Sequence, residues 1–164
     1  MHIDRRERNF IIASIVLMFV FAVFILVSSF VMKIQVPQAP VPLGRVNPNT
    51  VATPGVSPWG DPVEERLRQV GPNQYEVYIL GQAWSYQPAQ ITIPKGATVT
   101  FYVTSKDVIH GFDLQGTNIN MMIIPGQIST LTATFDTPGE YKFICNEYCG
   151  IGHQTMFGTL VVEP

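Results

Sequence analysis

The prediction of the fold depends most on the stretch Glu140-Tyr-Lys-Phe-Ile-Cys-Asn-Glu-Tyr-Cys-Gly-Ile-Gly-His-Gln-Thr-Met-Phe-Gly-Thr-Leu-Val-Val-Glu163. β-Branched and aromatic residues dominate its two ends, residues 140–145 and 158–163, as is typical of β-strands. The glycine-containing segment between them predicts a loop. Because a strand holds each end of this loop, the loop can keep its side chains in one arrangement.

The loop carries four potential metal ligands, Cys145, Cys149, His153 and Met156, at intervals of four, four and three. Thiolates, an imidazole and a thioether form a soft ligand set that suits copper better than magnesium or calcium. These two cysteines are the only ones in the 164 residues. Taken alone, the loop allows a disulfide, a single copper ion, or two copper ions bridged by both thiolates.

Further short runs of the same β-rich composition precede this stretch. They are Tyr75–Leu80, Ala89–Ile93, Ala97–Val103, Gly111–Leu114, Ile119–Ile124 and Ile128–Phe135. Turn signals separate them at Pro94-Lys-Gly96, Pro125-Gly126 and Pro138-Gly139. Seven or eight strands at this spacing predict an all-β, antiparallel Greek-key sandwich over residues 74–164.

The N-terminal part of the chain has a different character. Phe10–Met32 is a run of 23 residues without a charge, and as a helix it would be about 35 Å long, enough to cross a bilayer. It is longer than the apolar region of a cleaved signal peptide, so we expect a retained transmembrane helix. Arg5, Arg6 and Arg8 precede it and Lys33 follows it. The positive-inside rule therefore predicts that residues 1–9 are cytoplasmic and that everything after Lys33 is exported.

Residues 33–73 are predicted to connect the span to the sandwich. Six prolines between Gln35 and Gly60 favour an extended, proline-rich tether. The sequence Asp61-Pro-Val-Glu64 resembles a helix start and Gly71 a helix end, which predicts a short helix over about 62–70.

Residues 34–164 contain six Lys/Arg and ten Asp/Glu, a net charge of −4. A mildly acidic exported domain argues against nucleic acid as a partner. A copper pair would need two imidazoles, and the chain has three histidines. His153 lies in the loop, and His2 precedes the span. By elimination, His110 in Asp107-Val-Ile-His-Gly-Phe-Asp113 is the second candidate.

The Cys-x3-Cys-x3-His-x2-Met loop with the upstream Val108-Ile-His110 resembles the CuA domain of cytochrome c oxidase subunit II. The likeness extends over residues 74–164 and includes Tyr86-Gln-Pro88, Gly116-Thr-Asn-Ile-Asn120 and Met156-Phe-Gly-Thr-Leu-Val-Val162. The family has a cupredoxin-like sandwich with a binuclear copper centre. With one span instead of two, the chain resembles the short subunit II of the B-type, ba-like haem-copper oxidases.

The resemblance implies six copper ligands: the bridging thiolates of Cys145 and Cys149, the terminal imidazoles of His110 and His153, and the axial Met156 thioether and Glu147 backbone carbonyl. It also implies a possible magnesium ion near Glu147 at the interface with the catalytic subunit. Trp84 would belong to the aromatic group through which electrons arrive, although the aromatic segment is shorter here than is usual in the family.

In this family the subunit accepts single electrons from cytochrome c at the outer face of the cell membrane. It passes them to haem in catalytic subunit I, which reduces oxygen and translocates protons. The resemblance thus implies an oxidoreductase subunit and translocase component with no catalytic acid or base of its own. The alternatives are a stand-alone, membrane-anchored cupredoxin carrier, which predicts one copper ion per chain, and the copper domain of a nitrous oxide reductase. A quinol oxidase subunit lacks these ligands.

Overall fold

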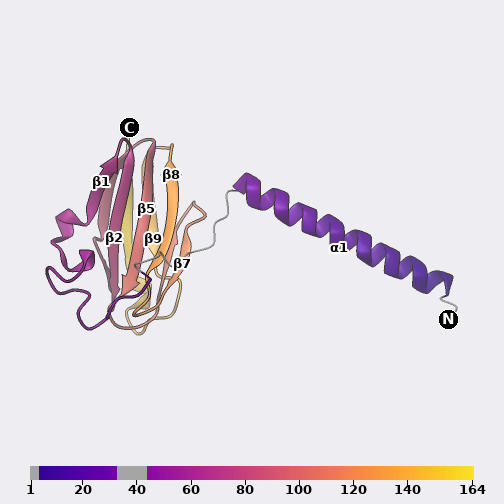
Figure 1. Cartoon of the computed structure of the whole chain (residues 1–164), viewed down its shortest axis with the longest axis horizontal. Helices are drawn as coiled ribbons and strands as arrows, with labels where there is room; N and C mark the ends of the chain where they lie inside the picture. The colour runs from indigo at the N-terminus through magenta and orange to yellow at the C-terminus, as the bar shows by residue number, and fades with distance from the viewer. Residues whose placement is uncertain (1–3, 33–43) are drawn as a thin grey trace. The chain divides into compact units, whose positions relative to one another are not determined.

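The computed structural model of the chain describes residues 4–32 and 44–164. The chain forms two units, residues 1–34 and 35–164. The first contains α1 (Arg5–Met32), and the second contains the strands. Figure 1 shows the helix and the layered β-domain.

The helix α1 contains 28 residues, and none of them is buried. Within the described residues it is the one helix long and apolar enough to cross a membrane. It begins at Arg5, five residues before the predicted span, because the three arginines at its start are good helix formers that need not enter the lipid. An apolar surface on all sides fits a membrane anchor.

The second unit is a sandwich of two five-stranded sheets (Figure 1). The first sheet contains β1 (Leu67–Gly71), β2 (Gln74–Gln82), β5 (Ala97–Ser105) and β8 (Ser129–Phe135) in this order, with β3 (Ser85–Gln87) paired to β2. The second sheet contains, in order, β4 (Gln90–Pro94), β10 (Phe157–Glu163), β9 (Gly139–Ile144), β6 (His110–Leu114) and β7 (Asn120–Ile123). The predicted all-β sandwich is confirmed.

Two neighbouring strand pairs differ from the antiparallel arrangement that the sequence predicts. β2 pairs with β5 in parallel, and β4 pairs with β10 in parallel. The chain leaves the first sheet after β3, forms β4 in the second sheet, and returns as β5. Such a crossover brings β5 back beside β2 in the same direction. The remaining pairs are antiparallel.

The core lies between the two sheets. Alternate residues of β5 face inward and are fully buried, as the period of two in a strand requires. They pack against aromatic side chains of the opposite sheet, including Phe112 and Phe143. Cys145, Cys149 and Met156 belong to this same buried cluster. The candidate metal loop is therefore a continuation of the hydrophobic core and not an appendage on it.

Residues 44–66, which belong to the predicted tether, pack against the sandwich. Val51 and Trp59 are both 1% exposed and form a second buried cluster with Tyr78, Leu80 and Ile128. The indole N–H of Trp59 donates to the carbonyl oxygens of Ile79 and Tyr102, at 3.0 and 3.2 Å. Prolines here shape the turns of a segment that covers the outer face of a sheet. Residues 33–43 of the predicted tether lie outside the described residues.

The helix predicted over residues 62–70 is wrong. The structure has two short 3-10 turns, η1 (Pro58–Gly60) and η2 (Val63–Glu65), followed by β1. A nine-residue helix is marginal by itself, whereas pairing with β2 satisfies the backbone groups of residues 67–71 and covers a sheet edge. Arg66 strengthens this arrangement, because its buried guanidinium donates to the carbonyl oxygens of Asp61 and Gln87.

Candidate metal centre

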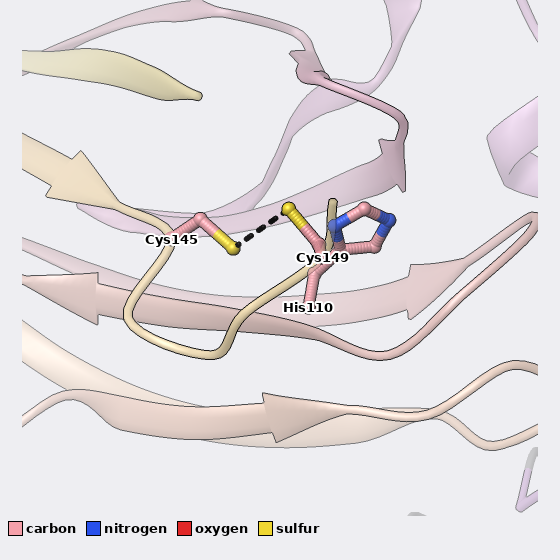
Figure 2. Close-up of side chains that lie close together, drawn as sticks. All are labelled: His110, Cys145 and Cys149. Atoms are coloured by element: carbon pink, nitrogen blue, oxygen red, sulfur yellow. Dashed lines mark hydrogen bonds between the residues drawn. The ribbon is translucent and has the colours of Figure 1, made fainter. Parts of the chain in front are cut away.

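Three of the predicted ligands come together at one end of the sandwich. Figure 2 shows His110 at the start of β6 facing the two cysteines of the loop between β9 and β10. A ring nitrogen of His110 and the sulfurs of Cys145 and Cys149 all lie within 4.8 Å of one another, and all three residues are buried. Thirty-four residues separate His110 from Cys145, so only the fold brings them together.

The loop is held at both of its ends. The N–H of Cys145 donates to the carbonyl oxygen of Met156 at 3.1 Å, which closes the loop at its base. Directly beyond, Ile144 pairs with Phe157 in the β9–β10 ladder. A 3-10 turn, η3 (His153–Thr155), shapes the returning part of the loop. The two strands therefore fix the spacing between the first and the last ligand candidate.

The two sulfurs lie 3.6 Å apart, and both cysteines are free. Cys149 also lies 3.6 Å from His153 Nδ1 and 3.9 Å from Met156 Sδ. Burial, followed by the neighbouring Cys145 thiol, raises the pKa of Cys149 to about 11. A metal ion must therefore displace the proton of this thiol at neutral pH.

Asp107 orients the ring of His110. Its Oδ1 lies 2.8 Å from His110 Nε2, and its Oδ2 accepts a hydrogen bond of 2.7 Å from the N–H of Ala83. Burial by itself would raise the pKa of Asp107, but hydrogen bonds from Ala83, His110 and Val108 outweigh burial and lower it. The ionised carboxylate accepts a hydrogen bond from the N–H at Nε2, which leaves the lone pair of Nδ1 for another partner.

Nδ1 of His110 is buried and has no hydrogen-bond partner among residues 4–32 and 44–164. Such an atom is costly in a protein interior unless something binds it. It stands beside two buried thiols, and the imidazole is fully buried. Two thiolates, an imidazole with a free lone pair and a thioether suit copper, so the residues present fit this metal.

The remaining predicted residues lie around this cluster. The carbonyl oxygen of Glu147 is 3.2 Å from Cys145 Sγ, and the Glu147 side chain is half-buried. Trp84 is 39% exposed, and its indole N–H donates to the carbonyl oxygen of Cys149 at 3.1 Å. Its ring occupies the space that a Cβ at Gly152 would need.

Sequence reasoning missed the supporting residues. Asp107 is not among the predicted site residues, although its position three residues before His110 is an available signal. Tyr86 enters the prediction only through the family likeness, with no role at the site. Gly111 received no role, although its place next to a ligand candidate in a strand indicates a close backbone approach. A Cβ there would lie only 2.7 Å from the backbone nitrogen of Asn146.

Comparison with known proteins agrees with this geometry. The family model of the periplasmic domain of cytochrome c oxidase subunit II matches residues 83–163. A cytochrome c oxidase subunit 2 of Thermus thermophilus is 55% identical over 121 residues, which cover 74% of this chain and 87% of the relative.

Solved structures extend the comparison to the fold. A haem-copper terminal oxidase dimer contains a chain with a TM-score of 0.77 and 31% identity, covering 97% of this chain and 100% of that one. The periplasmic domain of subunit II of the Bradyrhizobium japonicum cytochrome oxidase has a TM-score of 0.50 at 21% identity, over 53% of this chain and 82% of that one. The second likeness supports the fold alone. The chain thus belongs to the cytochrome c oxidase subunit II family, with a cupredoxin-like sandwich and an apolar N-terminal helix.

Proposed function

We propose that this chain is the subunit through which electrons enter a cytochrome c oxidase. It would accept electrons from cytochrome c and pass them to haem in a catalytic subunit I that reduces oxygen and translocates protons. The observation that carries the proposal is the buried cluster of His110, Cys145 and Cys149 in a chain of this family. In this proposal the chain would supply no catalytic acid or base and would act as an oxidoreductase only within the complex.

The proposed cofactor is a binuclear copper centre. Cys145 and Cys149 would bridge the ions, and His110 and His153 would be the terminal ligands. Met156 and the carbonyl oxygen of Glu147 would be the axial ligands. The contacts of 3.2–3.9 Å among these groups support the assignment. When bound, two copper ions that share one unpaired electron would take up and release single electrons with little rearrangement.

The chain's own residues hold the proposed ligands in place and bury the two sulfurs. The β9 and β10 strands fix the two ends of the loop, Trp84 holds the Cys149 carbonyl, and Asp107 holds the His110 ring. Ligands that are locked by packing and by hydrogen bonds need little rearrangement between oxidation states. Cys145 and Cys149 are both buried, which would limit the access of water to their sulfurs.

The surface beside the loop supports docking of partner proteins. Tyr148 and Ile151, both in the loop, are 82% exposed. Exposed apolar side chains next to an electron-transfer site are suited to a protein contact. Trp84 remains our proposed point of electron arrival, because it is partly exposed and contacts the backbone of a ligand candidate.

The helix α1 would anchor the chain in the lipid of the cell membrane as a single pass. Its arginine-rich start would stay in the cytoplasm, and the copper domain would lie on the outer or periplasmic face. A magnesium ion near Glu147 also remains a proposal, with further ligands coming from the catalytic subunit.

Metal stoichiometry together with electron spin resonance tests the function. The full chain in detergent, loaded with copper, should hold two copper ions per chain and show one unpaired electron shared by two nuclei. One copper ion with a single-nucleus hyperfine pattern would overturn the binuclear proposal and favour the stand-alone carrier.

Two substitutions test the ligand assignment. Cys149→Ser should abolish the shared-electron spectrum while the sandwich stays folded by circular dichroism. Met156→Leu should alter the spectrum without abolishing it, because an axial thioether is a weak ligand. The matched control is Met121→Leu, which changes another buried methionine of the same core. If Met121→Leu altered the spectrum as much as Met156→Leu, the axial assignment would be wrong.

A further inference from the structure

Gly111 lies where the β6–β9 ladder ends. The ladder pairs Leu114 with Phe143 and Asp113 with Ile144, and it goes no further toward Gly111. If it continued, Gly111 would stand opposite Asn146, which is already part of the metal loop. The sheet therefore opens at Gly111 to admit the loop.

The backbone N–H and C=O groups of Gly111 point toward the side on which β9 would lie if the β6–β9 ladder continued. N–H and C=O groups of alternate residues in a strand point to the same neighbour. Gln115 donates its N–H toward this side, to the carbonyl oxygen of Lys142 at 2.9 Å. Because these directions alternate along the strand, the backbone N–H and C=O groups of Asp113 and Gly111 point to the same side as those of Gln115. Gly111 thus has a donor and an acceptor that no strand satisfies.

Two side chains take the place of the missing strand. The N–H of Gly111 donates to Cys145 Sγ at 3.4 Å. The carbonyl oxygen of Gly111 accepts a hydrogen bond of 2.5 Å from the hydroxyl of Tyr86. One residue therefore connects a buried tyrosine to a sulfur of the candidate centre.

Tyr86 cannot easily place its hydroxyl elsewhere. It is a β3 residue, 1% exposed, and its ring packs edge-on against Phe112 and Phe143. The packed ring therefore holds the hydroxyl against the carbonyl oxygen of Gly111, to which the hydroxyl donates.

We propose that Tyr86 is a positioning residue of the metal centre: its hydroxyl holds Gly111 so that the N–H of Gly111 stays directed at the sulfur of Cys145. The inference rests on the proposed function, because it takes Cys145 as a copper ligand. A hydrogen bond at a ligand sulfur withdraws electron density from it and raises the reduction potential of the centre. Tyr86 would act on the metal through Gly111 and is not one of the proposed ligands.

Tyr86→Phe removes the hydroxyl and keeps the ring. In the full chain in detergent, we expect the metal-free variant to exchange the Gly111 amide hydrogen about tenfold faster by NMR, the effect of losing one hydrogen bond. The amides of Phe112 and Leu114 should be unchanged. After copper loading, the reduction potential should be lower and the sulfur-to-copper absorption should be shifted. If Tyr86 served packing alone, the substitution would change neither the reduction potential nor the absorption.

Tyr78→Phe is the matched control. Tyr78 is also buried and also donates its hydroxyl, to Glu76 Oε2 at 2.9 Å, but it belongs to the cluster around Trp59. This variant should leave the Gly111 amide, the potential and the absorption as in the wild type.

The outcomes separate the two proposals. Unchanged Gly111 exchange in Tyr86→Phe, or faster exchange throughout the core, would overturn the role of Tyr86. So would a reduction potential equal to that of Tyr78→Phe. If Tyr86→Phe failed to hold copper, a selective change at the Gly111 amide would still support the role. One copper ion in the wild-type chain would refute the binuclear centre, while the exchange data would still decide whether Tyr86 positions Gly111.

Discussion

The indole N–H of Trp84 donates a hydrogen bond of 3.1 Å to the carbonyl oxygen of Cys149. The same ring lies beside Gly150 and Gly152 of this loop, where an added Cβ would meet it. The turn between β2 and β3 therefore holds the middle of the candidate metal loop, whereas β9 and β10 hold only its ends. A turn that is distant in sequence thus restrains the loop together with the two strands that flank it.

Trp84→Phe should loosen this restraint. The variant keeps an aromatic ring but leaves the Cys149 carbonyl without its partner, which costs about 1 kcal/mol of the free energy of unfolding. We also expect copper to leave the variant faster in the presence of a chelator. Urea unfolding and the chelation rate measure the two effects. An unchanged chelation rate would show that the hydrogen bond does not restrain the loop.

Gly152→Ala should distort the loop, because the added Cβ would lie 2.7 Å from Trp84 Cγ and Cε3. Overpacking of this kind costs about 1–3 kcal/mol. The variant should therefore unfold at a lower urea concentration and show an altered copper spectrum.

The control for the glycine substitution is Gly71→Ala in β1, where the nearest atoms belong to the flexible Gln74 side chain. It should cost less than Gly152→Ala. In a Trp84→Ala background, the penalty of Gly152→Ala should largely disappear, because the ring that the Cβ meets is gone. An equal penalty in both backgrounds would contradict the clash.

Asp107→Asn should weaken metal binding. The carboxylate accepts hydrogen bonds from both His110 and the Ala83 N–H, and one oxygen of an amide cannot replace both. Loss of a partner that orients a metal-binding histidine typically lowers metal affinity about 10–100-fold. Competition with a copper chelator measures this, and the exposed Asp136→Asn is the control. Equal affinity in both variants would refute the orienting role of Asp107.

Stability should fall with alkaline pH through Tyr78. Burial, followed by the hydrogen bond and the charge of Glu76, raises the pKa of Tyr78 to about 12, whereas an unfolded tyrosine has a pKa of about 10. The folded state holds the proton more tightly, so this contribution to stability is complete below pH ~10 and is lost as the pH rises toward ~12. Urea unfolding of the wild type between pH 8 and 11 should show a steeper decline than that of Tyr78→Phe. Parallel declines would mean that Tyr78 does not titrate in this way.

The strands of the sandwich could be predicted because their signals are local. The run from Ala97 to Val103 alternates in polarity, and the structure extends it only to Ser105. By contrast, β1 and β3 went unpredicted. β1 carried helix signals, and its pairing with β2 is a property of the sheet edge and not of the segment itself. β3 contains only three residues, too few for a periodic pattern.

The sequence by itself determined the apolar helix, the strand pattern and the ligand types of the loop. These depend on uninterrupted hydrophobicity, on a period of two, and on spacing within a dozen residues. Only the tertiary structure brought His110 to the cysteines and left its Nδ1 without a partner beside them. It alone placed Asp107, Trp84 and Tyr86 as supports. These supporting contacts are made between segments from both sheets. The packing of the whole core therefore decides which side chains meet at the candidate metal centre.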